Sequence, residues 1–203
     1  MTTVDERRAM KRASPQVVLE EKHTQNCRVL PTREHLLGLL PKNGIAAEIG
    51  VAFGDFTREI VARTVPAKLH LVDVWSSARY QEGLNKIKEE FAAAIARDEI
   101  EINQGLSTER LRDFSNGYFD WLYIDTDHTY ATTRDELALA VHKVKPGGRI
   151  AGHDFTSGNS VTPWPYGVIE ACNEFCVARG WEYEYLTLEP HGHMSFSLRK
   201  LGA

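Results

Sequence analysis

The sequence predicts an α/β fold with a doubly wound, mostly parallel sheet whose last strand is antiparallel. Short apolar runs of strand length alternate with longer segments of helical period between residues 45 and 179. This alternation is typical of repeated βα units, which place helices on both faces of a parallel sheet. Two more strand-like runs, 181–188 and 194–199, follow with no helix between them. We therefore expect them to pair as antiparallel neighbours at one edge.

The earlier strands are expected at the apolar runs 45–49, 68–74, 100–103, 119–124 and 149–153. The runs KLHLVDV and FDWLYI are rich in the β-branched and aromatic residues that favour strands. Helices are expected at 33–40, 57–63, 80–97, 107–114, 131–144 and 168–179. The segment Pro146-Gly147-Gly148 is predicted to be a turn after the fifth of these helices, and Gly180 is predicted to end the sixth.

The length of 203 residues predicts one main domain, which we place at residues 31–203. Residues 1–30 are expected to form an N-terminal extension, partly disordered or helical, because their first half is polar and charged. The net charge of -4 argues against nucleic acid or an anionic membrane as the main partner. A homo-oligomer stays open.

A cytoplasmic location is expected from three observations. No apolar run is long enough to span a bilayer. Residues 1–13 are charged and lack the apolar core of a signal peptide. The three cysteines match neither a disulfide framework nor a zinc site.

The most informative motif is the run AEIGVAFGDF at residues 47–56, which has the pattern E-x-G-x-x-x-G between a strand and a helix. Glycines in such a turn let a ligand approach free N–H groups at the start of the helix. The dinucleotide fingerprint has a glycine where this chain has Ala52, and no phosphate-binding G-K-[ST] follows. The acid Glu48 suits a cationic or hydroxyl-bearing ligand. An ordinary turn with two glycines is the alternative interpretation.

Polar residues follow the predicted strands, at the edge of the sheet where ligands bind in this fold class. Asp73 ends the second strand, a position that can accept both hydroxyls of a ribose. Asp125 and His128 follow the fourth strand, and His153 and Asp154 follow the fifth. Each could instead be a helix cap or a turn residue, since Asp in particular favours both.

Five segments in this order resemble the class I S-adenosylmethionine-dependent methyltransferases: EIGVAFGDFTREI, HLVDVW, DWLYIDTDHTY, KVKPGGRIAGHDF and GVIEACNEF. More narrowly, the chain resembles the bacterial branch of the macrolide-sugar O-methyltransferases (the family 24 type), and more distantly catechol O-methyltransferase. The resemblance extends from about Ile45 to Arg199. It implies a Rossmann-like methyltransferase fold with a seven-stranded sheet whose last strand is antiparallel, in agreement with the pattern above.

The resemblance also implies a site for S-adenosyl-L-methionine. Glu48, Gly50 and Gly54 would line its methionine end, and Asp125 would also bind the cofactor. Asp73 would hold the ribose hydroxyls. The adenine ring would lie among Trp75, Gly105 and Ser107.

Metal-dependent members of this branch bind a divalent cation, and their motif places its ligands at Asp125, His153 and Asp154. The relatives carry Glu-Asp or Asp-Asn where this chain has the pair His153-Asp154. Histidine weakens the preference for Mg²⁺ and favours Mn, Fe or Zn. It also leaves open that His153 is a base and that no metal binds.

The implied reaction is methylation of a hydroxyl of a small molecule, a sugar or a phenol. His128 is the expected base, because macrolide members have a histidine at the matching place; a capping or surface histidine is the alternative. The loop 156–167, with Trp164 and Tyr166, is expected either to form a substrate wall or to fill the core. The run His191-Gly192-His193 is predicted to be a turn without a metal role.

Two other functions stay open at this point. A nicotinamide-dependent oxidoreductase could use a similar sheet, although the missing G-x-G counts against it. A non-catalytic cofactor-binding subunit is the other, and the set Asp125, His128 and Asp154 counts against that.

Overall fold

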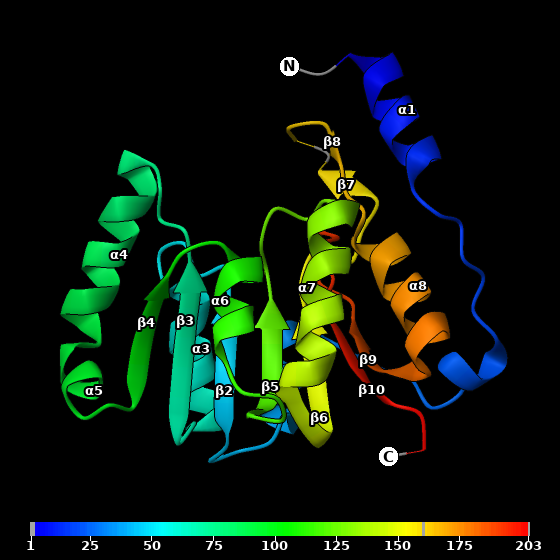
Figure 1. The fold of residues 1–203 in the computed structure, drawn as a ribbon. Coiled ribbons are helices and arrows are strands. Elements are labelled where there is room, and N and C mark those ends of the chain that lie inside the picture. Colours follow the sequence, from blue (N-terminus) through cyan, green and yellow to red (C-terminus); the bar gives the residue numbers. More distant parts are fainter. Residues whose placement is uncertain (1–2, 160, 203) are drawn as a thin grey trace.

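The computed structural model describes residues 3–159 and 161–202, which fold around an eight-stranded sheet (Figure 1). The strand order is β1-β9-β10-β6-β5-β2-β3-β4. The strands are β1 Arg28–Leu30, β2 Ile45–Ile49, β3 Lys68–Asp73, β4 Ile100–Gln104, β5 Phe119–Ile124, β6 Val144–Gly152, β9 Trp181–Thr187 and β10 Phe196–Lys200. Only β10 is antiparallel to its neighbours, β6 and β9. The predicted doubly wound α/β fold with an antiparallel last strand is confirmed.

The sheet has one strand more than the seven that were expected. The additional strand, β1, pairs in parallel with β9 and forms the edge of the sheet. It lies within the expected N-terminal extension, and two of its three residues are exposed. Such a short, half-exposed strand leaves no hydrophobic period in the sequence, so its position depends on the free edge of β9.

Helices cover both faces of the sheet, as Figure 1 shows for α7 and α8 in front and α3 behind. The helices are η1 Glu21–His23, α1 Val4–Ala13, α2 Arg33–Leu39, α3 Asp55–Thr64, α4 Ala78–Glu90, α5 Ala92–Ala96, α6 Ser107–Asp113, α7 Tyr130–Lys143 and α8 Val168–Arg179. In β5, Trp121 and Tyr123 pack into one core with α2, α3 and α4, while Leu122 and Ile124 pack into the other with α7 and α8. Burial on both faces explains why this strand is almost continuously apolar.

Three local differences from the prediction have clear causes. The helix expected at 80–97 breaks at Phe91, whose φ of -100° and ψ of 16° interrupt it between α4 and α5. The Pro146-Gly147-Gly148 segment lies inside β6 rather than in a separate turn, where the pairing with β5 shifts register. The loop at 156–167 contains a small hairpin, β7 Gly158–Asn159 and β8 Trp164–Pro165.

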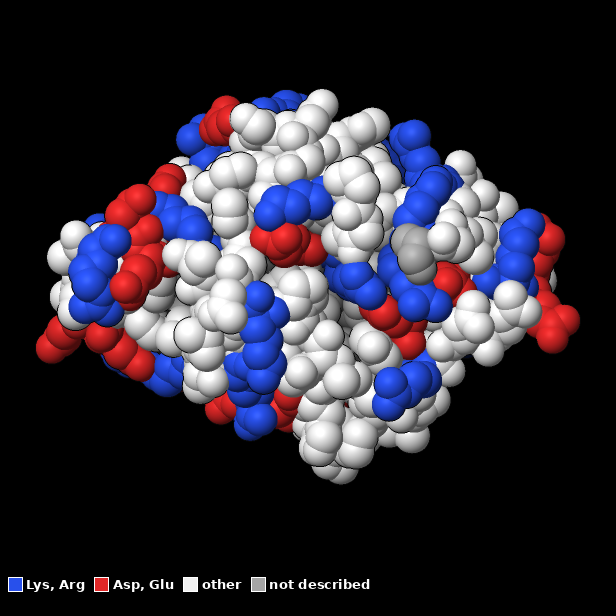
Figure 2. Space-filling model, turned by 90° about the horizontal axis from the view of Figure 1, so that it is seen from below, with Lys and Arg blue, Asp and Glu red and all other residues white. Residues whose placement is uncertain are grey.

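Helix α1 lies beside this hairpin and is tied to the start of α8 (Figure 1). The Lys11 ammonium donates to the carbonyl of Tyr166 at 2.7 Å and to Glu170 at 2.5 Å. Figure 2 shows the molecule from below, from the end of the sheet that lies away from α1 and the hairpin. On this surface acidic and basic side chains are interspersed. None of the helices in the described part of the chain has the length and apolar character needed to cross a membrane.

Candidate active site

A cavity of about 570 Å³ opens at the carboxyl ends of β2, β3, β4 and β5. Its size is that of a pocket for a small ligand or cofactor. Seven of the residues predicted for the site line it: Glu48, Gly50, Asp73, Gly105, Ser107, Asp125 and His128. Gly54 and Trp75 do not line it.

The turn after β2 explains the two glycines of the motif. Gly50 has a φ of 90°, and a Cβ there would lie 1.9 Å from the carbonyl oxygen of Asp125. Glycine is therefore required because the backbone of Asp125, directly after the neighbouring strand β5, packs against this turn. Gly54 has a φ of 77° and is the N-cap of α3. It begins the helix and does not line the cavity.

Asp73 organises the same turn through its carboxylate. One oxygen accepts from the backbone N–H groups of Val51 at 2.8 Å and Ala52 at 2.9 Å, and the other accepts from Trp75 at 2.9 Å. A carboxylate has about four lone-pair sites, so one remains beyond these three bonds. The side chain can therefore hold the turn and still accept a hydroxyl group from the cavity.

The structure departs from the expectation at Trp75, whose ring was to flank an adenine. Its side chain is completely buried, and its indole N–H donates to the carbonyl of Ala52 at 3.0 Å. The apolar surface at this end of the cavity comes instead from Leu106, which is 53% exposed. Leu106 lies between the predicted residues Gly105 and Ser107, but the motif gave it no role.

Glu48 is a buried acid that lines the cavity, with 1% of its surface exposed. It accepts a hydrogen bond of 2.5 Å from the hydroxyl of Thr57. Burial raises the pKa of Glu48 to about 8, and the negative charge of Asp125 adds to this shift.

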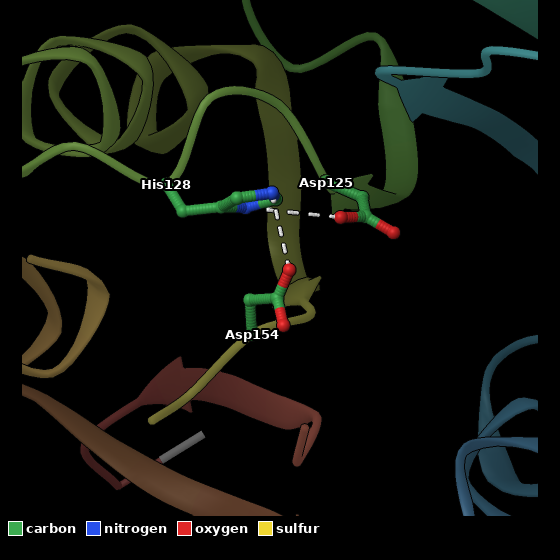
Figure 3. A group of neighbouring side chains, drawn as sticks. All are labelled: Asp125, His128 and Asp154. Carbon is green, nitrogen blue, oxygen red and sulfur yellow. Dashed lines mark ion pairs between the residues drawn. The ribbon is translucent and has the colours of Figure 1, made fainter. Parts of the chain in front are cut away.

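Asp125, His128 and Asp154 converge beside this cavity from the ends of β5 and β6 (Figure 3). Nε2 of His128 lies 3.1 Å from Oδ2 of Asp154, and its Nδ1 lies 3.9 Å from Oδ1 of Asp125. One ligand atom from each residue lies within 4.8 Å of the others. Burial raises the pKa of Asp125, although His153 and His128 act in the other direction.

Asp154 is the hub of a cluster that contains three histidines. Besides His128, it contacts Nδ1 of His153 at 3.7 Å and accepts a hydrogen bond from Nδ1 of His193. Burial by itself would raise the pKa of Asp154, but the contacts with His153 and His128 lower it to about 2. The carboxylate is therefore ionised at neutral pH and can accept hydrogen bonds from the surrounding rings.

The sequence prediction missed the contact of His193, which was expected only in a turn. A topological signal for it exists. Strand β10 lies antiparallel beside β6, so the loop that precedes β10 must reach the carboxyl end of β6, where Asp154 lies. A histidine at the start of an inserted antiparallel strand is thereby brought to the site.

His153 lies close to Asp125 and Asp154 but is not one of the three residues whose ligand atoms lie within 4.8 Å of one another. Its Nδ1 is 3.8 Å from Oδ2 of Asp125, whereas its Nε2 is buried without a hydrogen-bond partner among the described residues. The geometry thus places His128, rather than His153, together with Asp125 and Asp154.

The 156–167 loop supplies one aromatic ring to the site. Tyr166 is 6% exposed, and its ring centre lies 4.7 Å from that of His128. Trp164 keeps 37% of its surface exposed in β8. Tyr166 is therefore buried against His128, while Trp164 stays partly exposed.

Comparisons with known proteins place the chain in a family. A family described as a methyltransferase domain matches residues 47–155, more than half of the chain. Among curated protein sequences, none matches significantly.

Three solved structures illustrate the likeness of the fold. The pyocyanin biosynthetic protein PhzM has a TM-score of 0.60 and 14% identity, over 82% of this chain and 53% of PhzM. The B. subtilis tRNA methyltransferase TrmK has a TM-score of 0.60 and 12% identity, over 85% of this chain and 67% of its own. A SAM-dependent methyltransferase from Aquifex aeolicus has a TM-score of 0.59 and 10% identity, over 94% of this chain and 96% of its own.

The chain thus spans about half the length of PhzM. At these identities the structures support a shared fold, and the sequence match over residues 47–155 supports the family. The chain belongs to the methyltransferase domain family, within the class I S-adenosylmethionine-dependent methyltransferases.

Proposed function

We propose that this protein transfers a methyl group from S-adenosylmethionine to a hydroxyl of a small molecule, a sugar or a phenol. The observation that carries the proposal is the pair formed by His128 and Asp154, 3.1 Å apart. His128 also lines the cavity that contains the predicted cofactor residues. A basic imidazole oriented by a carboxylate is the group that methylation of a hydroxyl needs.

The sheet order gives the cofactor a direction in the cavity. Along the edge from β4 to β6, the lining passes from Gly105 to Asp73, then to Glu48, and then to Asp125. In the proposed orientation adenine, ribose and methionine follow this order. The sulfonium methyl then faces the acceptor beside His128.

The chain's residues would carry out the transfer by orientation and proton removal. When bound, S-adenosylmethionine would supply an electrophilic methyl group and would keep the electron pair of the broken carbon–sulfur bond, while the acceptor oxygen would bond to the methyl carbon and lose its proton. The hydroxyl proton passes to Nδ1 of His128, while the ionised Asp154 accepts from Nε2–H and fixes this tautomer. Tyr166 packs against the ring and shields it. Alignment of this kind lowers a barrier by several kcal/mol.

Substitution of His128 tests the proposal. We expect His128→Ala to lower kcat by about 10²–10⁴, the range for loss of a general base, while the affinity for S-adenosylhomocysteine changes little. His142→Ala serves as the matched control, because His142 lies at the end of α7 outside the cavity. An unchanged kcat for His128→Ala in a correctly folded protein would contradict the role.

A metal-assisted form of the same reaction is a second candidate, supported by the three ligand atoms within 4.8 Å. Asp125, His128 and Asp154 would hold the ion, with His153 near both acids. This set of two carboxylates and an imidazole fits Mn, Fe or Zn better than Mg. When bound, such a cation lowers the pKa of an acceptor hydroxyl and orients it.

Metal removal distinguishes the two forms. If a cation belongs to the site, protein purified without chelator contains one equivalent by elemental analysis, and a strong chelator abolishes transfer. Asp154→Asn should then lose the ion. Full transfer in the presence of chelator would contradict metal assistance and leave His128 and Asp154 as the catalytic pair.

A further inference from the structure

We propose that Arg33 is the carboxylate anchor for the methionine end of the cofactor and makes the cavity select a cofactor that has an α-carboxylate. The inference rests on the proposed function, because it assigns a new residue to the same cofactor site. Arg33 is the first residue of α2 and lies outside the segment that matches the family.

Two contacts hold Arg33 in place at the cavity. Its backbone N–H donates to the carboxylate of Glu189 at 2.6 Å, which connects the start of α2 to the loop before β10. Its guanidinium carbon lies 4.3 Å from the centre of the Phe56 ring. Stacking on an aromatic face fixes the plane of the guanidinium and limits its freedom before a ligand arrives.

The guanidinium still has donors to offer. Its nearest acids are Glu34 at 3.9 Å and Asp125 at 4.0 Å, and both separations exceed hydrogen-bonding distance. Among the described residues its side chain makes no hydrogen bond, yet it lines the cavity and is 29% exposed. A planar fork of free N–H groups is suited to bind a carboxylate through two parallel bonds.

The surroundings of Arg33 favour the cofactor over the acceptor. Arg33 lies beside Asp125 at the end of β5 and over Phe56 of the helix that follows β2. These two strands are neighbours in the sheet, at the place proposed for the methionine end. Asp154, where we place the acceptor, follows β6 on the far side of β5.

The charges also match. The methionine end of the cofactor carries an ammonium and a carboxylate that are both attached to its α-carbon. Glu48 and Asp125 offer two acids to the ammonium, and Arg33 offers a cation to the carboxylate. Opposite charges arranged in this way recognise a zwitterion, whereas the acids alone would repel its carboxylate.

Two ligands that differ in the amino-acid part separate this role from others. S-adenosylhomocysteine has the α-carboxylate, whereas methylthioadenosine shares its adenosine and sulfur but lacks the amino acid. The affinities for both ligands should be measured by titration calorimetry on the unmodified protein and on Arg33→Met. Methionine keeps an unbranched side chain against Phe56. Arg63→Met is the matched control, because Arg63 is an exposed arginine paired with Glu59.

In Arg33→Met we expect the affinity for S-adenosylhomocysteine to fall by about 10- to 100-fold, as for loss of charge-assisted hydrogen bonds. The affinity for methylthioadenosine should stay within about twofold. Arg33→Lys should recover part of the loss, because the charge remains without the planar fork. Arg63→Met should bind both ligands like the unmodified protein.

Three results would overturn the assignment. Equal losses for both ligands would show that Arg33 acts only through packing on Phe56. Unchanged affinities would show that the carboxylate binds elsewhere. Unchanged affinities with a raised KM for the acceptor would assign Arg33 to the acceptor. Failure of the proposed function looks different, because the unmodified protein would then bind neither ligand.

Discussion

At the scale of a single residue, we expect Glu48 to make the affinity for the cofactor depend on pH. With a pKa of about 8 it is largely protonated at neutral pH when the cavity holds no ligand. The ammonium of a bound cofactor favours the carboxylate, so binding lowers this pKa and releases a proton. Affinity for S-adenosylhomocysteine should therefore rise as pH increases toward about 8 and level off above it.

Glu48→Gln is the matched test, because glutamine keeps an acceptor for Thr57. Its affinity should show a smaller rise over the same pH range in calorimetric titrations. Parallel pH profiles for Glu48→Gln and the unmodified protein would mean that another group accounts for the dependence.

Some site residues could be predicted from the sequence, and others could not. Asp73, Asp125 and Asp154 end apolar strands, so the rule that ligands bind at carboxyl ends brought them to one edge. His193 precedes a strand, and Arg33 begins a helix. No local sequence pattern identifies either residue as part of the site. Their positions follow only from the insertion of β10 beside β6 and from the packing of α2 on α3.

At the scale of an element, the conformation of the turn after β2 depends on how closely the backbone after β5 packs against it. Gly50 and Gly147 both have positive φ, 90° and 78°, but a Cβ at Gly147 would meet nothing within 4 Å. We expect Gly147→Ala to cost about 1–2 kcal/mol of unfolding free energy from backbone strain alone. Gly50→Ala should cost about 1–3 kcal/mol more, because its Cβ overlaps the Asp125 carbonyl.

Denaturant unfolding of the two variants gives these differences directly. Equal costs would mean that the turn moves away from β5 without penalty, and the account of Gly50 would then be wrong. The comparison needs no ligand, so it is independent of the functional proposal.

The elements themselves were predictable where burial imposes a period. The continuous apolar run of β5 and the apolar faces of the helices set these elements in the sequence. The edge strand β1 and the break at Phe91 carry no such period. Both depend on contacts with distant parts of the chain, which override local propensity.

At the scale of the whole molecule, the candidate site combines the segment that matches the family with segments outside it. Residues 47–155 contribute the cofactor turn, Asp73 and the two acids after β5 and β6. Arg33 and His193 enter from before and after that range. The outer segments therefore complete both ends of the proposed reaction path, the methionine end and the acceptor end.

The central claim is that the cavity at the strand ends binds S-adenosylmethionine, and titration of its product S-adenosylhomocysteine tests it most directly. The account predicts one molecule bound per chain. Asp73→Ala should weaken binding at least about tenfold, because the ribose loses its acceptor and the N–H groups of Val51 and Ala52 lose theirs. Absence of binding, or binding of a nicotinamide dinucleotide in its place, would contradict the account.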